Sequence, residues 1–173
     1  MSAVMDAPWS VIVRLDQVGQ GTGRKLAADA QQRARIARDV GLDTLDRLEA
    51  EVEVLPWGRD YEIKGRFLAA GSQTCGVTLE PLPVELEGRF SVKASETPEE
   101  EPRDPELEIG LDTPDPADLI ENGQIDLAAY VIEHLALEVD PFPRKPGAEF
   151  EPPAAEAEPS PFAVLAALKR DRE

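Results

Sequence analysis

Two stretches decide the fold: Tyr61-Glu-Ile-Lys-Gly-Arg-Phe-Leu-Ala-Ala70 and Leu82-Pro-Val-Glu-Leu-Glu-Gly-Arg-Phe-Ser-Val-Lys93. In both, apolar residues alternate with charged ones, and successive side chains of an extended strand point to opposite faces. This pattern is typical of an antiparallel sheet with one face on the core and the other in water. The segment between the stretches, from Gln73 to Pro83, holds the only cysteine, Cys75. The sequence therefore predicts a long β-hairpin whose turn contains Cys75.

Upstream of this hairpin, the spacing of apolar residues predicts three further elements. A strand is expected over residues 8–18, and a second over residues 51–55. Between them, apolar residues at three- and four-residue steps predict a helix from Lys25 to Val40, which Gly41 would end. Residues 42–48 are expected to form a short link.

Downstream of the hairpin, one strand and one clear helix are expected. Residues 107–111 alternate in polarity and predict the strand. The helix begins after Asp126, a good N-cap residue, and carries an apolar stripe that includes Leu127, Val131 and His134. The predicted fold is therefore α+β: an antiparallel β-sheet or partly closed barrel flanked by two helices, with a flexible C-terminal tail.

Composition sets the domain limits. Residues 8–150 are expected to form a single domain, interrupted by a mobile acidic loop at about 94–106, which is rich in proline and glutamate and has no apolar anchor. Residues 151–173 are expected to be a linker rich in Pro, Ala and Glu followed by a short terminal helix. In that helix Phe162, Leu165 and Leu168 share one face, and Lys169 and Arg170 follow.

The charge is unevenly distributed along the chain. The whole sequence has 18 basic and 35 acidic residues, which gives a net charge of −17. Residues 1–47 hold 7 of the basic and 6 of the acidic ones, so the remainder carries −18. Nucleic acid would be repelled by such a chain, except where cations gather locally.

Targeting signals and disulfides are not indicated by the sequence. There is no apolar run long enough for a transmembrane helix, and the N-terminus lacks the basic start and apolar block of a secretory signal. A single cysteine cannot form an internal disulfide and fits a reducing compartment. A cytoplasmic protein without membrane contact is expected.

Cys75 invites three chemical interpretations. A zinc site needs about four ligands, and the chain has one Cys, one His and no C-x-x-C pair. A nucleophilic thiol would need a base, and His134 lies on an apolar helix stripe typical of a packed core histidine. A redox switch would need positive neighbours, whereas Glu80 and Glu85 are negative. A buried structural cysteine at a turn fits better, so neither an enzyme nor a metal or other cofactor is expected.

Five stretches stand out by their order and spacing: Arg14-Leu15, Gln73-Thr-Cys-Gly-Val-Thr-Leu-Glu-Pro81, Ile125-Asp-Leu127 leading into Glu133-His-Leu-Ala-Leu137, Pro141-Phe-Pro-Arg-Lys-Pro-Gly-Ala-Glu-Phe150, and Ser160-Pro-Phe-Ala-Val-Leu165. Through them most of the chain, from roughly Pro8 onward, resembles the YceD family of bacterial and plastid proteins. The last two look like the alphaproteobacterial variant. The family's second cysteine would fall at Thr78 and its later pair around residues 143–147, where this chain has none.

What the resemblance implies is a non-enzymatic ribosome-assembly factor needed for accumulation of large-subunit ribosomal RNA. Its partner would be a pre-ribosomal large-subunit component, protein or rRNA, and no small-molecule substrate is expected. An acidic adaptor or chaperone for basic ribosomal proteins is the alternative, and a thiol-dependent redox module at Cys75 is a further one. The candidate partner contacts are Arg24, Lys25, Arg33, Arg35, Arg38, Cys75, Arg144 and Lys145.

Overall fold

The structure, a computed structural model, describes residues 7–97 and 116–150. Its elements are, in order, β1 (Ile12–Arg14), a 3-10 turn (Leu15–Gln17), β2 (Thr22–Ala27), α1 (Ala30–Val40), β3 (Thr44–Trp57), β4 (Asp60–Thr74), β5 (Pro81–Ser95), β6 (Asp118–Leu119), β7 (Gln124–Asp126) and α2 (Leu127–Glu138). The strand expected at 107–111, the terminal helix, the linker and most of the acidic loop lie outside the described residues.

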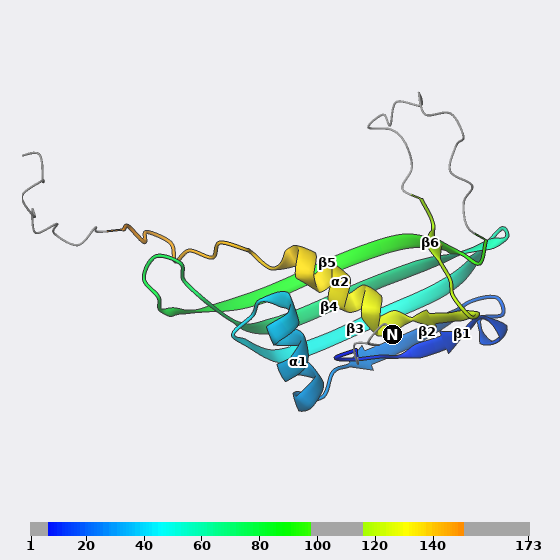
Figure 1. The fold of residues 1–173 in the computed structure, drawn as a ribbon, viewed down its shortest axis with the longest axis horizontal. Helices are drawn as coiled ribbons and strands as arrows, with labels where there is room; N and C mark the ends of the chain where they lie inside the picture. Colours follow the sequence, from blue (N-terminus) through cyan, green and yellow to red (C-terminus); the bar gives the residue numbers. More distant parts are fainter. Residues whose placement is uncertain (1–6, 98–115, 151–173) are drawn as a thin grey trace, which may run out of the picture.

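The main sheet has five strands in the order β2-β3-β4-β5-β6, and β1 pairs with β7 beside it (Figure 1). All neighbours are antiparallel except β5 and β6, which are parallel. Two helices and this mostly antiparallel sheet confirm the predicted α+β class. The sheet is open, so the antiparallel-sheet alternative holds and the partly closed barrel does not form.

The hairpin of β4 and β5 is the longest pairing in the sheet, and its alternation is as predicted. Its register runs from Tyr61 opposite Ala94 to Thr74 opposite Pro81. Ile63 and Phe67 are buried, whereas Lys64 and Arg66, which alternate with them, are exposed. One face of the hairpin therefore belongs to the core and the other to solvent.

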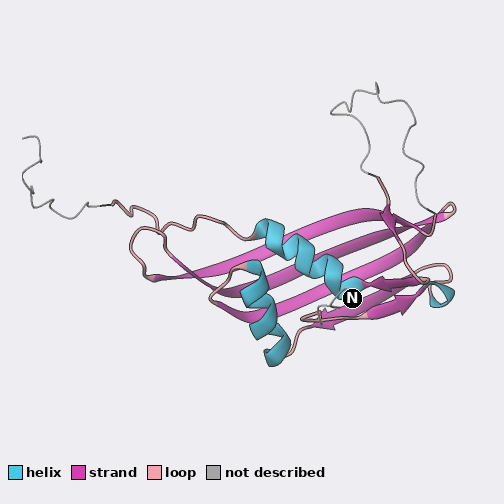
Figure 2. Cartoon of the chain, in the orientation of Figure 1, coloured by secondary structure: helices cyan, strands magenta, loops and turns pink. Residues whose placement is uncertain are grey.

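Both helices cover the core face of the sheet (Figure 2). Helix α1 packs on β3, and α2 packs on β4 and β5. The Asp126 carboxylate accepts a hydrogen bond from the Ala128 N–H (3.1 Å), which confirms the predicted N-cap of α2. Leu127, Val131 and Leu135 are fully buried between this helix and the sheet.

The predicted helix start and the predicted link were wrong. Helix α1 begins at Ala30, because Asp29 and Gln32 form a reciprocal capping box there. Residues 22–27 instead pair with β3, with Lys25 opposite Glu51. Most of the link expected at residues 42–48 belongs to β3, where Leu45 and Leu48 are buried.

Two glycines leave room for aromatic rings on the core face of the hairpin. Gly65 pairs with Phe90, and Phe67 pairs with Gly88. A Cβ on Gly65 would lie 2.2 Å from Phe90 Cζ, and one on Gly88 would lie 2.4 Å from Phe67 Cζ. The His134 ring of α2 stacks on Phe90 with a centroid distance of 4.3 Å. Helix and sheet are thus joined through a glycine, a phenylalanine and a histidine.

Candidate functional site

The Cys75 turn is closed by the segment that follows α2. The backbone N–H of Lys145 donates to Cys75 Sγ (3.3 Å), and the Thr78 N–H donates to the same sulfur (3.5 Å). The Gly76 N–H donates to the Pro143 carbonyl (2.9 Å), and Lys145 Nζ pairs with Glu80 (2.9 Å). Residue 78 and residues 143–147, where the family resemblance places the other cysteines, therefore lie beside Cys75.

Hydrogen bonds make the Cys75 thiol acidic although its side chain is fully buried. The pKa of the thiol is lowered to about 6 by hydrogen bonds from the Thr78 side chain and then from the backbone N–H groups of Thr78, Lys145 and Val77. These bonds outweigh burial, which raises the pKa. The expectation that Glu80 and Glu85 would prevent a lowered thiol pKa was wrong. The nearby N–H groups act on the sulfur directly, and Glu80 is paired with Lys145.

This thiol should make stability depend on pH. A pKa of about 6 in the folded chain against an ordinary 9.0 means that the folded state favours the thiolate. The stabilising contribution should be absent below pH 6, grow as pH rises to 9 and be complete above it. We expect the Tm of the wild type to rise through this window relative to Cys75→Ser, measured by differential scanning calorimetry. If the Tm values of the two proteins changed with pH in the same way, this prediction would be contradicted.

His134 does not join Cys75 in a nucleophile–base pair. Its Nδ1 bonds to the Tyr130 carbonyl (2.8 Å), so Nδ1 carries the proton, and its ring stacks on Phe90. The hydrogen bonds of Cys75 are with Thr78 and Lys145 instead. Within residues 7–97 and 116–150, no three His, Cys, Asp or Glu side chains are grouped so as to hold a metal ion.

The predicted basic contacts do not form one patch. They fall on β2, on α1 and in the segment after α2: Arg24 and Lys25; Arg33, Arg35 and Arg38; Arg144 and Lys145. Several are engaged within the chain: Arg33 donates to the carbonyls of Ala28 (2.6 Å) and Leu45 (3.2 Å), and Lys25 pairs with Glu51. Lys145 of this set is hydrogen-bonded to Cys75 through its backbone N–H.

An acidic hollow lies at the other end of α2, and sequence reasoning did not find it. Its volume is about 460 Å³, and its lining includes four carboxylates: Asp118, Glu121, Asp126 and Glu133. The described residues that line it include no Lys or Arg. Tyr130 also lines the hollow. Burial raises the pKa of its hydroxyl, and the charge of Asp118 and a hydrogen bond with Asp118 raise it further. β6 and β7 bring these carboxylates to the start of α2, so a scan for local motifs could not group them.

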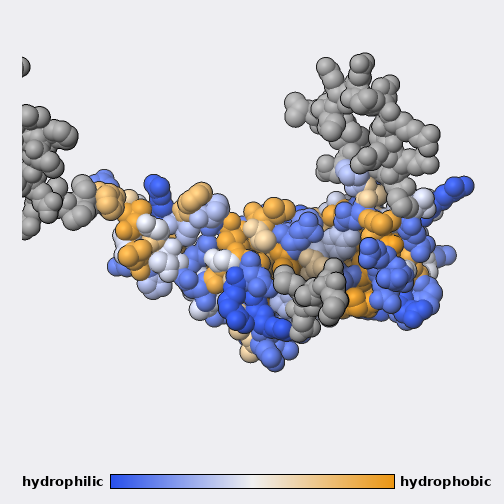
Figure 3. Space-filling model, in the orientation of Figure 1, coloured by the Kyte–Doolittle hydropathy of each residue, from blue (hydrophilic) through white to orange (hydrophobic). Residues whose placement is uncertain are grey.

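Apolar side chains reach the surface at the end of the molecule where the Cys75 turn and the segment after α2 meet (Figure 3). Leu79 and Phe142 are both largely exposed there. We call these two residues the apolar end.

No helix of the described chain is long and apolar enough to cross a membrane.

Residues 63–169 match the protein family described as "Large ribosomal RNA subunit accumulation protein YceD". The chain belongs to the YceD family. The matched region takes in most of the β4–β5 hairpin, the Cys75 turn and α2, and it continues through the C-terminal segment to residue 169. No curated protein and no solved structure matches the chain. The family description connects this chain to the accumulation of large-subunit ribosomal RNA.

Proposed function

We propose that this protein is a non-enzymatic assembly factor, acting in the cytoplasm, that is needed for accumulation of large-subunit ribosomal RNA. The observation that carries the proposal is the YceD family match over residues 63–169. The Cys75 turn supports a structural role for its cysteine, because the thiol is fully buried and accepts hydrogen bonds from backbone N–H groups. A reactive thiol needs exposure as well as acidity, so the redox alternative has weaker support.

The acidic hollow favours a basic ribosomal protein as the direct partner. Three of its four carboxylates are exposed, and the fourth, Asp126, caps α2. By contrast, Lys25, Arg33 and Lys145 are already engaged within the chain. Fields of opposite sign steer association, and a chain of net charge −17 would be repelled by RNA phosphates. The proposed mode is therefore that of an adaptor: it holds a Lys/Arg-rich ribosomal protein during subunit assembly. Direct contact with rRNA through the exposed arginines is the competing mode.

Depletion tests the biological role. When the protein is depleted from growing cells, mature large-subunit rRNA should fall relative to small-subunit rRNA, measured by quantitative hybridisation. A plasmid copy of the wild type should restore the ratio, and so should Cys75→Ser, because the serine hydroxyl can still accept the two backbone hydrogen bonds. An unchanged ratio on depletion would overturn the proposed function. Failure of Cys75→Ser alone would bring the thiol mechanism back.

A further inference from the structure

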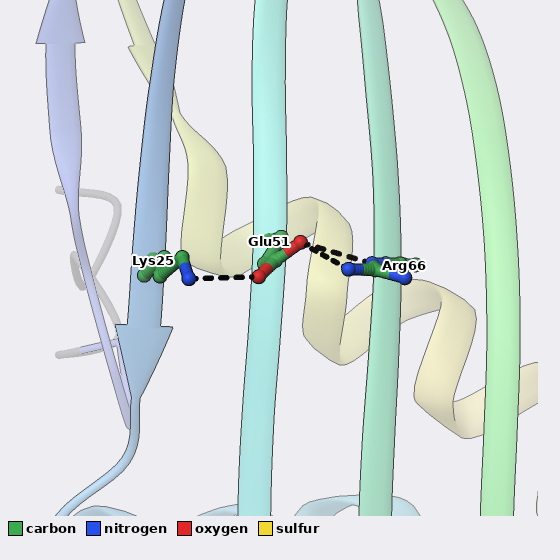
Figure 4. A network of polar contacts seen from close by, with 3 residues as sticks. All are labelled: Lys25, Glu51 and Arg66. Carbon is green, nitrogen blue, oxygen red and sulfur yellow. Dashed lines mark hydrogen bonds and ion pairs between the residues drawn. The ribbon is translucent and has the colours of Figure 1, made fainter.

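A second hollow lies on the sheet itself. It has a volume of about 730 Å³ and is lined by adjacent segments of β2, β3, β4 and β5. Charged side chains cross it in a row, with Glu51 on β3 bonded to Lys25 on β2 and to Arg66 on β4 (Figure 4). Because these residues alternate with buried ones along their strands, they project on the face away from the core. We call this cavity the sheet hollow.

An exposed leucine stands in the sheet hollow between carboxylates. Leu68 is 47% exposed, and its direct neighbours across the strands are Glu49 on β3 and Glu87 on β5. Glu138 also lines the hollow. Since Glu51 is engaged by Lys25 and Arg66, the other charged residues of the lining are three carboxylates and one cation, Arg89. The surface therefore suits a segment that presents apolar side chains followed by positive charge.

The C-terminal segment of this chain has that composition. Phe162, Leu165 and Leu168 recur at three-residue steps, and Lys169, Arg170 and Arg172 follow them. The family match extends to residue 169, so it includes the apolar part of the segment. A segment of this kind meets both features of the hollow, its exposed leucine and its excess of carboxylates.

The intervening chain is long enough to reach. The chain passes the Cys75 turn at Lys145, and the described part ends at Phe150. From Pro81, at that end of β5, to Glu87 in the hollow is six residues, or about 20 Å at the rise of a strand. Lys145 is held at the Cys75 turn, and the fifteen residue steps from Lys145 to Ser160 span at most about 50 Å. The segment can therefore pass round β5, which pairs with β6 only at Ala94 and Ser95, to the open face.

We propose that residues 160–170 of the same chain dock in the sheet hollow, with their apolar face on Leu68 and their cations on Glu49 and Glu87. The docked segment would cover an apolar position that the helices leave open. This inference is independent of the ribosomal role.

Hydrogen exchange with mass spectrometry on the full chain tests the docking. Amides of residues 162–169 should exchange about tenfold more slowly than in a synthetic peptide of the same sequence. The variant Leu68→Glu should return them to the peptide rate, because it places a charge against the apolar face. The matched control is Phe142→Glu, at a residue that is 78% exposed on the apolar end and closer along the chain to the segment. This control should keep the protection.

Three results would overturn the proposal. One is exchange in the wild type as fast as in the free peptide. Another is protection that survives Leu68→Glu but is lost in Phe142→Glu, which would place the segment on the apolar end. The third is protection that grows with protein concentration, which would assign the hollow to the segment of a second copy. Circular dichroism of both variants should match the wild type, since both sites are exposed.

Discussion

Replacing Gly65 with alanine is expected to lower the free energy of unfolding by about 3 kcal/mol, the upper part of the usual range for overpacked cores. The new methyl group would lie 2.2 Å from Phe90 Cζ, closer than real contacts allow. The ring has little room to withdraw, because His134 of α2 also stacks on it. Relief would require movement of the helix or a change in strand spacing. Urea denaturation followed by circular dichroism measures the loss.

A double-mutant cycle separates this overlap from a general intolerance of alanine in a strand. Phe90→Leu alone should destabilise the protein through a lost ring, and Gly65→Ala added to it should cost much less than in the wild type. Gly23→Ala is the matched control, because Gly23 lies in β2 and its Cβ would lie 3.5 Å from Glu53 Cγ, an ordinary contact. Strictly additive losses in the cycle would show that Phe90 is not what excludes the methyl group.

Alternation of polarity was sufficient to predict the hairpin. A strand has only two faces, so a run such as Tyr61 to Ala70 assigns each side chain to one of them. The same pattern could not distinguish strand from helix around Leu26, because a single apolar residue among polar ones fits either. There the capping box of Asp29 and Gln32 decides, and its positions three residues apart could have been recognised in the sequence.

Glycines within strands carried a signal that alternation alone does not use. Gly65 and Gly88 occupy core-facing positions, where an absent side chain marks the close approach of another group. Which group approaches depends on register, since Phe90 and Phe67 lie opposite them only in the observed pairing. The sequence could therefore indicate a close contact but could not identify the ring that makes it.

The candidate site was predictable only in part, because its parts are far apart in the chain. Cys75 and Lys145 were both selected from the sequence, but their contact spans seventy residues and depends on where the chain leaves α2. The acidity of the thiol also depends on this contact, since a backbone N–H group leaves no trace in the residue type. The acidic hollow depends similarly on β6 and β7 returning to the start of α2.

Reversing two charges in the acidic hollow is expected to weaken binding of a basic ribosomal protein by about tenfold or more. Glu121→Lys with Glu133→Lys removes two attractions and adds two repulsions. At about 0.2–1 kcal/mol for each exposed pair, these four terms sum to about 0.8–4 kcal/mol, and the middle of that range exceeds the 1.4 kcal/mol of a tenfold change. Both residues are exposed, whereas Asp126 must be spared because it caps α2 and accepts the Val11 N–H (2.8 Å). Isothermal titration calorimetry with the partner recovered from a nuclease-treated lysate measures the affinity.

A change of net charge alone would weaken binding somewhat. The control variant must therefore change the net charge by the same amount at positions outside the acidic hollow. Asp39→Lys with Asp46→Lys alters the total charge equally at exposed positions on α1 and β3, outside the lining of the acidic hollow. The control should bind within about twofold of the wild type at 0.15 M salt, where charges more than about 8 Å apart are largely screened. If both variants lose affinity equally, the partner responds to overall charge and not to this hollow. If neither does, the adaptor mode is wrong, and the exposed arginines become the place to look for contact with rRNA.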